Sequence, residues 1–198
     1  MKDLQIPIRD ISRELARRFS TMTHEELEVL ESILVPMKFK KGEKILNQGD
    51  VSQYIYYLHS GLVRQYYHKN GKDMTSFLGV DGVIFMSIES LFKEMPSAET
   101  IEALEPCYVY ALPKRRLENV ALHNQNIQIL YRKMLEDSLI ADRKYADLVR
   151  FESAQDRYRR ICKEMSQVVL RAPLVYIASY LQMTPETLSR VRSTTAIE

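Results

Sequence analysis

Hydrophobic residues change their spacing three times along the chain. Between residues 21 and 34 they recur every three or four positions, which is typical of one face of an α-helix. Thr23 is a favourable N-cap residue, and Glu26, three positions later, completes a capping box. The sequence therefore predicts a helix directly after Thr23. Its apolar face would be formed by Leu27, Leu30, Ile33 and Leu34.

Over residues 40–113 the hydrophobic period falls to two, which is typical of β-strands. Tyrosine and β-branched residues, which are frequent in strands, are common here. Many short strands separated by regular turns predict a sandwich, a barrel or a jelly roll. One segment with helical spacing, residues 87–95, interrupts the strands.

Three turns can be placed within this strand-rich region. Two are expected at residues 60–61 and 70–71, and the second is an Asn-Gly pair, which is a strong hairpin signal. A third turn, at residues 105–106, divides residues 100–112 into two short runs. These two runs are expected to be a strand pair around that turn.

Residues 114–167 return to helical spacing, and residues 124–151 contain neither glycine nor proline. A helix of this length can bury its apolar face in its own domain or against a second copy of itself. We favour a dimer seam between two such helices, although Asp137 and Ser138 interrupt the heptad pattern. The face is formed by Ile127, Leu130, Met134, Ala141, Tyr145 and Leu148.

Residues 174–191 have the pattern of a helix-turn-helix. The residue where the two helices cross must be small, and it is Ala178. The residue that opens the turn favours a positive φ and is usually glycine, but here it is Gln182. A left-handed conformation at such a residue costs roughly 1 kcal/mol, which a fold can tolerate. The apolar positions, where the helices face each other and the core, are Ile177, Leu181, Met183, Leu188 and Val191.

The second helix of this motif leaves a polar face for solvent or a partner. In a helix-turn-helix, the N-terminal part of the second helix enters the major groove of DNA. Arg190 can donate two hydrogen bonds to guanine, and Glu186 can accept one from cytosine. Thr184 and Arg192 are better placed for phosphates, which fix the register without reading sequence. The candidate DNA-binding residues are Thr184, Pro185, Glu186, Ser189, Arg190 and Arg192.

The chain resembles the superfamily of bacterial transcription factors that contains the cyclic AMP receptor protein and the fumarate–nitrate regulator, the Crp/Fnr family. Residues 42–50 and 54–64 look like the glycine-punctuated opening of a cyclic-nucleotide-binding jelly roll, and residues 96–107 look like its later strands. Residues 184–192, "TPETLSRVR", closely resemble the recognition helix of the family. The resemblance covers about residues 20–192.

This resemblance implies an α+β architecture in three parts. The parts are a cyclic-nucleotide-binding-like sensor jelly roll over residues 20–113, a dimerisation helix over residues 114–149 and a helix-turn-helix DNA-binding domain over residues 150–198. It also implies a homodimer that binds a pseudo-palindromic DNA site, RNA polymerase as a further partner, and base-reading roles for Glu186 and Arg190.

We expect this regulator to be cytoplasmic and to have no membrane partner. No apolar run approaches the ~20 residues that span a bilayer, and the first 20 residues are charged throughout, without an apolar signal-peptide core. Residues 150–198 hold 8 Lys and Arg against 5 Asp and Glu. This excess is a weak indication of a nucleic-acid partner.

The sensor departs from the family in the residues that hold cyclic AMP. Members that bind cyclic AMP carry an Arg-Ser or Arg-Thr pair on the phosphate. In this chain the pair falls on residues 97–98, and no arginine or lysine lies between Lys93 and Lys114. Bidentate recognition of a phosphate is therefore not expected, and Glu89 would repel one. Cyclic AMP is thus not the expected ligand, whereas an uncharged or cationic effector, a partner protein or no ligand remain open. The candidate pocket residues are Ser87, Glu89, Ser97 and Thr100.

The sequence gives no indication of a metal, another cofactor or an enzyme. Two cysteines are too few for an iron–sulfur cluster, which needs about four. The four histidines lack the spacing of metal or haem ligands. There is no Ser-His-Asp order and no phosphate-binding glycine loop.

A competing interpretation is a cyclic-nucleotide or small-molecule binding module that acts through protein contacts, with a helix-turn-helix that no longer binds DNA. Many relatives in the family add a β-hairpin wing after the recognition helix, whereas this sequence ends at Glu198. Without a wing, the phosphate contacts should be weaker or be left to Arg171 and Arg192; a longer natural chain is the alternative.

Overall fold

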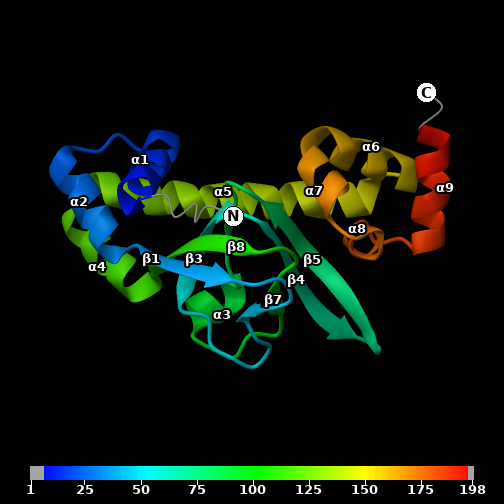
Figure 1. Ribbon diagram of the computed structural model, residues 1–198, viewed down its shortest axis with the longest axis horizontal. Helices are drawn as coiled ribbons and strands as arrows, with labels where there is room; N and C mark the ends of the chain where they lie inside the picture. The colour runs from blue at the N-terminus through cyan, green and yellow to red at the C-terminus, as the bar shows by residue number, and fades with distance from the viewer. Residues whose placement is uncertain (1–6, 196–198) are drawn as a thin grey trace.

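The structure is a computed structural model that describes residues 7–195. Two antiparallel four-stranded sheets face each other (Figure 1). The cluster between them includes Leu58, Ile101 and Val109, and the predicted jelly roll is confirmed. The first sheet contains, in spatial order, β1 (Val35–Phe39), β8 (Cys107–Pro113), β3 (Tyr54–Ser60) and β6 (Ile84–Phe85). The second contains β2 (Lys44–Leu46), β7 (Thr100–Ala103), β4 (Leu62–Lys69) and β5 (Lys72–Val80).

The turns at residues 60–61 and 70–71 are confirmed. Asn70 and Gly71 join the paired strands β4 and β5 with φ angles of 52° and 73°, as in a type I′ hairpin. Gly61 has a φ of 124° and carries the chain from one sheet to the other. A Cβ at Gly61 would lie 2.5 Å from the sulfur of Cys107. Only glycine therefore fits this crossing.

The expectation that the two runs of residues 100–112 pair with each other was wrong. β7 pairs with β2 and β4, whereas β8 pairs with β1 and β3 in the opposite sheet. After β7, the backbone N–H of Leu104 donates to the carbonyl of Leu62 at 2.7 Å. This contact keeps the chain beside β4 for one more residue, and the following turn then crosses between the sheets. The predicted helical interruption is present as α3 (Ile88–Lys93).

Three helices form a second layer at one end of the jelly roll: α1 (Ile8–Phe19), α2 (His24–Ile33) and α4 (Lys114–His123). α1 was not expected, because its stretch is rich in charge. Its apolar residues Ile11, Leu15 and Phe19 are four positions apart, and all three are buried in one cluster with α2, α4 and α5. The predicted capping box at the start of α2 is confirmed, since Thr23 and Glu26 bond each other's backbone N–H groups.

Replacing Thr23 with alanine is expected to lower the free energy of unfolding by about 1 kcal/mol, because the N–H of Glu26 loses its acceptor at 3.3 Å. Urea unfolding measures this change. Thr21→Ala is the matched control, since Thr21 is exposed and precedes the helix. Equal stability of the two variants would mean that the capping box does not stabilise α2.

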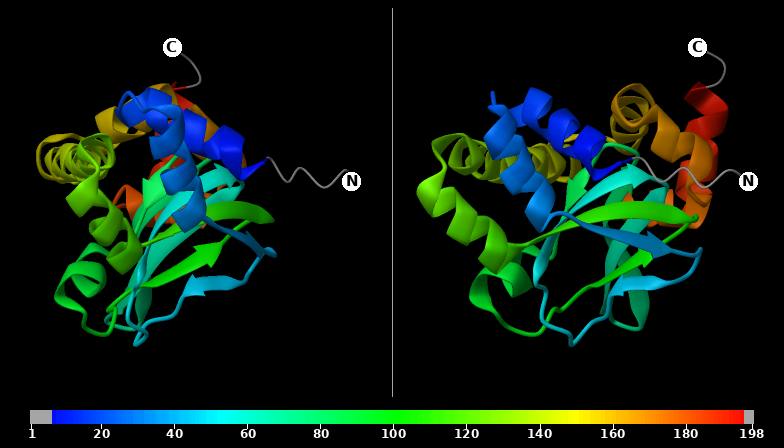
Figure 2. Two further views of the ribbon diagram at one scale, coloured as in Figure 1. Left: turned by 90° about the vertical axis from the view of Figure 1, so that its left-hand side faces the viewer. Right: turned by 60° about the vertical axis from the view of Figure 1, so that its left-hand side comes forward.

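The segment expected as one dimerisation helix over residues 114–149 contains two helices. α4 ends at His123, and α5 (Gln125–Phe151) begins after Asn124, whose φ of −135° and ψ of 104° are extended. The break lets α4 and the start of α5 pack side by side on the same cluster. α5 then runs along one side of the sheets to the C-terminal helices (Figures 1 and 2).

The face of α5 interpreted as a dimer seam is largely buried within its own chain. Ile127, Leu130 and Met134 are fully buried in the cluster with α1 and α2. Leu148 is buried in the C-terminal cluster, and Tyr145 packs against it. The interpretation of this face as a seam was therefore wrong, because the chain's own helices already cover most of it.

Four helices close the described chain: α6 (Ala154–Glu164), α7 (Ser166–Arg171), α8 (Leu174–Tyr180) and α9 (Pro185–Thr195). Residues 196–198 of the expected DNA-binding domain lie outside the described part of the chain. Ile177, Ala178, Leu181 and Leu188 are buried, as the helix-turn-helix pattern requires. Gln182, at the turn, has a φ of 52°. The predicted positive φ at a residue other than glycine is thus confirmed.

α8 is docked directly on the second sheet. The hydroxyl of Ser179 accepts a hydrogen bond from the backbone N–H of Thr75 in β5 at 2.9 Å. The guanidinium of Arg64, in β4, lies 3.8 Å from the centre of the Tyr176 ring. The DNA-binding candidate helices and the sensor therefore share an interface rather than only a connecting helix.

Candidate functional site

The polar face of α9 is open to solvent. All six candidate DNA-binding residues are exposed, whereas Leu188 is buried beneath them and Val191 is half-buried. The hydroxyl of Thr184 accepts a hydrogen bond from the N–H of Thr187 at 3.2 Å. Thr184 thus caps the helix and Pro185 is its first residue. The exposed residues are Thr184, Pro185, Glu186, Ser189, Arg190 and Arg192.

Glu186 and Arg190 carry opposite charges on neighbouring turns of this face. The pKa of Glu186 is lowered, first by a hydrogen bond from the Thr184 hydroxyl and then by the backbone N–H of Glu186 itself. The nearby charge of Arg190 lowers this pKa further. The carboxylate is therefore ionised at neutral pH and accepts hydrogen bonds. Within residues 7–195, the Arg190 guanidinium makes one long hydrogen bond of 3.4 Å to the Thr187 hydroxyl, so it is available to a partner.

The two arginines expected to contact phosphates, Arg192 and Arg171, differ in their contacts. Arg192 is exposed near the end of α9, where it hydrogen-bonds the hydroxyl of Tyr158. Arg171 instead bridges α7 to the sensor, and donates to Asp81 at 2.7 Å and to Glu105 at 2.6 Å. These carboxylates raise the pKa of Arg171. The expectation that Arg171 contacts DNA phosphates is therefore not supported in this conformation.

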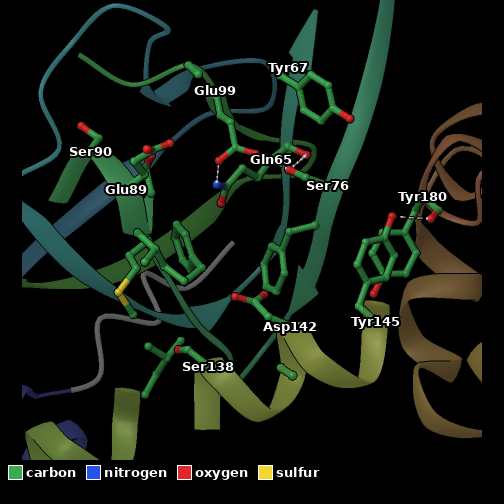
Figure 3. Close-up of a pocket in the computed structure, with 18 of the residues that line it drawn as sticks. Gln65, Tyr67, Ser76, Glu89, Ser90, Glu99, Ser138, Asp142, Tyr145 and Tyr180 are labelled. Carbon is green, nitrogen blue, oxygen red and sulfur yellow. Dashed lines mark hydrogen bonds between the residues drawn. The ribbon is translucent and has the colours of Figure 1, made fainter. Parts of the chain in front are cut away.

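A cavity of about 1030 Å³ lies between the second sheet, α3, α5 and the C-terminal helices (Figure 3). Of the predicted pocket residues, Ser87 and Glu89 line it. Ser97 is buried in the wall, where its hydroxyl lies 3.0 Å from that of Ser87. Thr100 is also buried, and its hydroxyl accepts a hydrogen bond from the N–H of Gln48 at 3.2 Å. The structure thus places two of the four at the cavity and two behind its surface.

Glu89 is not an isolated charge. Its carboxylate accepts a hydrogen bond from Lys93, one turn later in α3, at 2.6 Å. This contact lowers the pKa of Glu89. Glu89 and Lys93 therefore neutralise each other at the rim of the cavity.

The cavity contains polar residues that the sequence did not indicate. Glu99 accepts hydrogen bonds from the amide of Gln65 and from the hydroxyl of Ser76, the latter at 2.7 Å. Asp142 of α5 faces these groups across the cavity (Figure 3). Partial burial, followed by the charge of Glu99, raises the pKa of Asp142. Ser138 also lines the cavity. It is one of the two polar residues that interrupt the apolar pattern of α5, so this interruption could have indicated the site from the sequence.

Residues 7–195 contain neither a cluster of metal-binding side chains nor a membrane-spanning helix. In that part of the chain, no group of three or more His, Cys, Asp or Glu residues is arranged to hold a metal ion. None of its helices combines the length and the apolar character needed to cross a lipid bilayer.

Comparisons with known proteins give relatives of one kind. Residues 36–124 match the family model of the cyclic nucleotide-binding domain. The HTH-type transcriptional regulator ArcR of Staphylococcus aureus is 26% identical over 132 residues, which are 66% of this chain and 56% of the relative. The matched segment thus spans little more than half of that curated relative.

Solved structures share the fold over most of both chains. FixK2 from Bradyrhizobium japonicum has a TM-score of 0.72 at 21% identity, over 83% of this chain and 85% of its own. A protein from Eubacterium rectale, described as a transcriptional regulator of the Crp/Fnr family, has a TM-score of 0.65 at 17% identity, over 89% and 84%. The names of ArcR and of the E. rectale protein are those of transcription regulators, not of enzymes. Residues 36–124 therefore resemble the cyclic nucleotide-binding domain, and the chain has the same fold as FixK2 and the E. rectale protein.

Proposed function

We propose that this protein is a homodimeric, sequence-specific DNA-binding transcription regulator with an effector-sensing jelly roll. The observation that carries the proposal is α9, whose apolar residues Leu188 and Val191 are packed inward while the six candidate DNA-binding residues remain exposed. A regulator of this type acts in the cytoplasm, with RNA polymerase as a further partner. The name of the S. aureus relative, an HTH-type transcriptional regulator, supports this proposal.

The chemistry of α9 supports direct reading of bases. The available guanidinium of Arg190 matches the two acceptors of guanine, and the ionised carboxylate of Glu186 matches the amino group of cytosine. Thr184 and Arg192 flank these two residues and suit phosphate contacts. Each half-site would thus be read by the first two turns of one helix.

A second copy of the chain supplies the second recognition helix. α5 has an exposed face opposite its buried one, where Leu139 is 70% exposed. Part of this face is a shallow groove of about 540 Å³, whose lining includes Ile129, Leu135 and Leu139. An apolar stripe along a long helix suits pairing with the same stripe of a second copy. The two-fold axis of such a pair requires a pseudo-palindromic site, with half-sites about 10 bp or a multiple apart.

Arg190→Ala is expected to weaken binding to the preferred site by roughly 1–3 kcal/mol and to relax discrimination at one base pair in each half-site. Arg192→Ala should instead weaken binding to all sequences alike and reduce the salt dependence by about one unit for each phosphate that the protein no longer neutralises. Selection from randomised DNA, followed by titration at several salt concentrations, measures both effects.

The same titrations separate the regulator from the alternative of a binding module that acts through protein contacts. A regulator is retained on DNA in a salt-dependent way, whereas such a module is not retained. If Arg190→Ala keeps the sequence preference of the wild type, Arg190 does not read a base and the assignment of α9 is wrong.

A further inference from the structure

The cavity joins the sensor to the DNA-binding candidate helices. Its walls include Phe77 of β5, Asp142 of α5, Ile161 of α6 and Tyr180 of α8. Tyr145 links α5 to α8, since its ring stacks on Tyr180 at 4.7 Å and its hydroxyl donates to the Tyr180 carbonyl at 2.9 Å. A molecule in this cavity would therefore contact the jelly roll and the helix-turn-helix unit at once.

The polar centre of the cavity carries negative charge. Two neutral donors, Gln65 and Ser76, hold the carboxylate of Glu99 in place. Among residues 7–195, no lysine, arginine or histidine forms a salt bridge with Glu99, and Asp142 likewise has no hydrogen bond or salt bridge in that range. The two carboxylates thus line one cavity, Glu99 beside the second sheet and Asp142 on α5 (Figure 3).

Three lysine and arginine residues line this cavity, and two of them are paired with acidic residues other than Glu99 and Asp142. Lys93 is paired with Glu89, and Arg160 is paired with Glu152. Lys144, the third, lies two residues after Asp142 on α5, and both are exposed. A phosphate would therefore meet the carboxylate of Glu99 without an inward-facing guanidinium to hold it.

The remaining wall is apolar and aromatic. Phe77, Phe85 and Met86 line the side formed by the strands, and Tyr145 lines the side formed by α5. Pockets of this volume that combine an apolar wall with a few converging polar groups are typical of small-molecule sites. An aromatic or apolar body fits this wall, while the carboxylates require a cation at one end.

We propose that the cavity binds an organic amine with an aromatic or apolar body, whose ammonium group lies between Glu99 and Asp142, and that it rejects cyclic nucleotides. An ammonium group donates three hydrogen bonds, and its positive charge offsets the negative charge that both carboxylates give to the cavity. This inference deepens the proposed function and rests on it only for the consequence that the ligand acts on DNA binding.

Calorimetry on the full chain with three matched probes tests the assignment. Tyramine carries the ammonium, 4-ethylphenol lacks it, and 3-(4-hydroxyphenyl)propanoate replaces it with a carboxylate. Tyramine is expected to bind at least about tenfold more tightly than either analogue, because a charged hydrogen bond is lost with each. Cyclic AMP, as a fourth probe, should bind no better than the propanoate.

Two charge-removing variants keep the test independent of folding. Glu99→Gln and Asp142→Asn should each weaken tyramine by about tenfold, and Asp142→Asn leaves no described partner unpaired. Glu28→Gln, remote and exposed in α2, is the matched control and should bind like the wild type.

Several results would overturn the assignment. They are no tyramine binding at millimolar concentrations, equal binding of the propanoate, tight binding of cyclic AMP, or unchanged binding by both charge-removing variants. DNA binding measured on the same samples separates this failure from failure of the proposed function. A protein that binds DNA through Arg190 but ignores tyramine contradicts only the ligand class.

Discussion

Replacement of Arg64 by methionine is expected to lower the free energy of unfolding by about 3–5 kcal/mol, the usual cost of removing one partner from a buried ion pair. The side chain of Arg64 is 2% exposed. Its Nε donates to Thr75 at 2.9 Å and one Nη donates to Glu102 at 3.3 Å. The ring of Tyr176 covers the guanidinium plane. Methionine fills the space but satisfies none of these groups.

Urea unfolding, followed by circular dichroism, measures this loss. Lys44 also bonds Glu102, so Glu102 keeps one partner and the loss should fall toward the lower end of the range. Arg115→Met is the matched control, because Arg115 is 85% exposed and its contact with Glu94 contributes little. If both variants lose less than about 1 kcal/mol, Arg64 does not stabilise the sensor.

Leu139→Glu is expected to convert the proposed dimer into monomers and to leave the fold of each chain intact. Leu139 lies five positions after Met134, which is about 140° around the helix, so the two residues occupy different faces of α5. A two-fold seam brings both introduced carboxylates together. The dissociation constant should rise by about 100-fold or more, as sedimentation velocity over a concentration series measures.

Two further variants make this result specific. Lys41→Glu changes an exposed residue in the turn between β1 and β2, outside α5, and should remain dimeric. Met134→Glu should unfold the chain rather than dissociate it, because Met134 is fully buried among α1 and α2. A Leu139→Glu protein that stays fully dimeric would exclude this face of α5 as the seam.

The features that the sequence could predict are those with local causes. The hairpin at Asn70 and Gly71 and the capping box at Thr23 each depend on a few adjacent residues. The turn at Gln182 was also predictable, because the spacing of apolar residues around it fixes the crossing of two short helices. In each case the chemistry that determines the structure lies within about one helical turn or one β-turn.

The features that the sequence could not predict depend on which surfaces meet. The spacing of apolar residues in α5 predicts that one of its faces is buried. It does not indicate whether α1 and α2 or a second chain bury that face. α1 itself was hidden, because charged residues dominate its composition. Glu99 and Asp142 face each other only because the jelly roll places its later strands beside α5. Nothing in either local sequence indicates the other.

The bridge made by Arg171 has a consequence for the modularity of this protein. One guanidinium on α7 holds a carboxylate on each of two sensor loops and also the carbonyl of Gly61, at 2.8 Å. A chimera that combines this jelly roll with the C-terminal helices of another protein would leave Asp81 and Glu105 without their shared cation. The two halves can therefore be exchanged between proteins only as a matched set, with the arginine and both acids transplanted together.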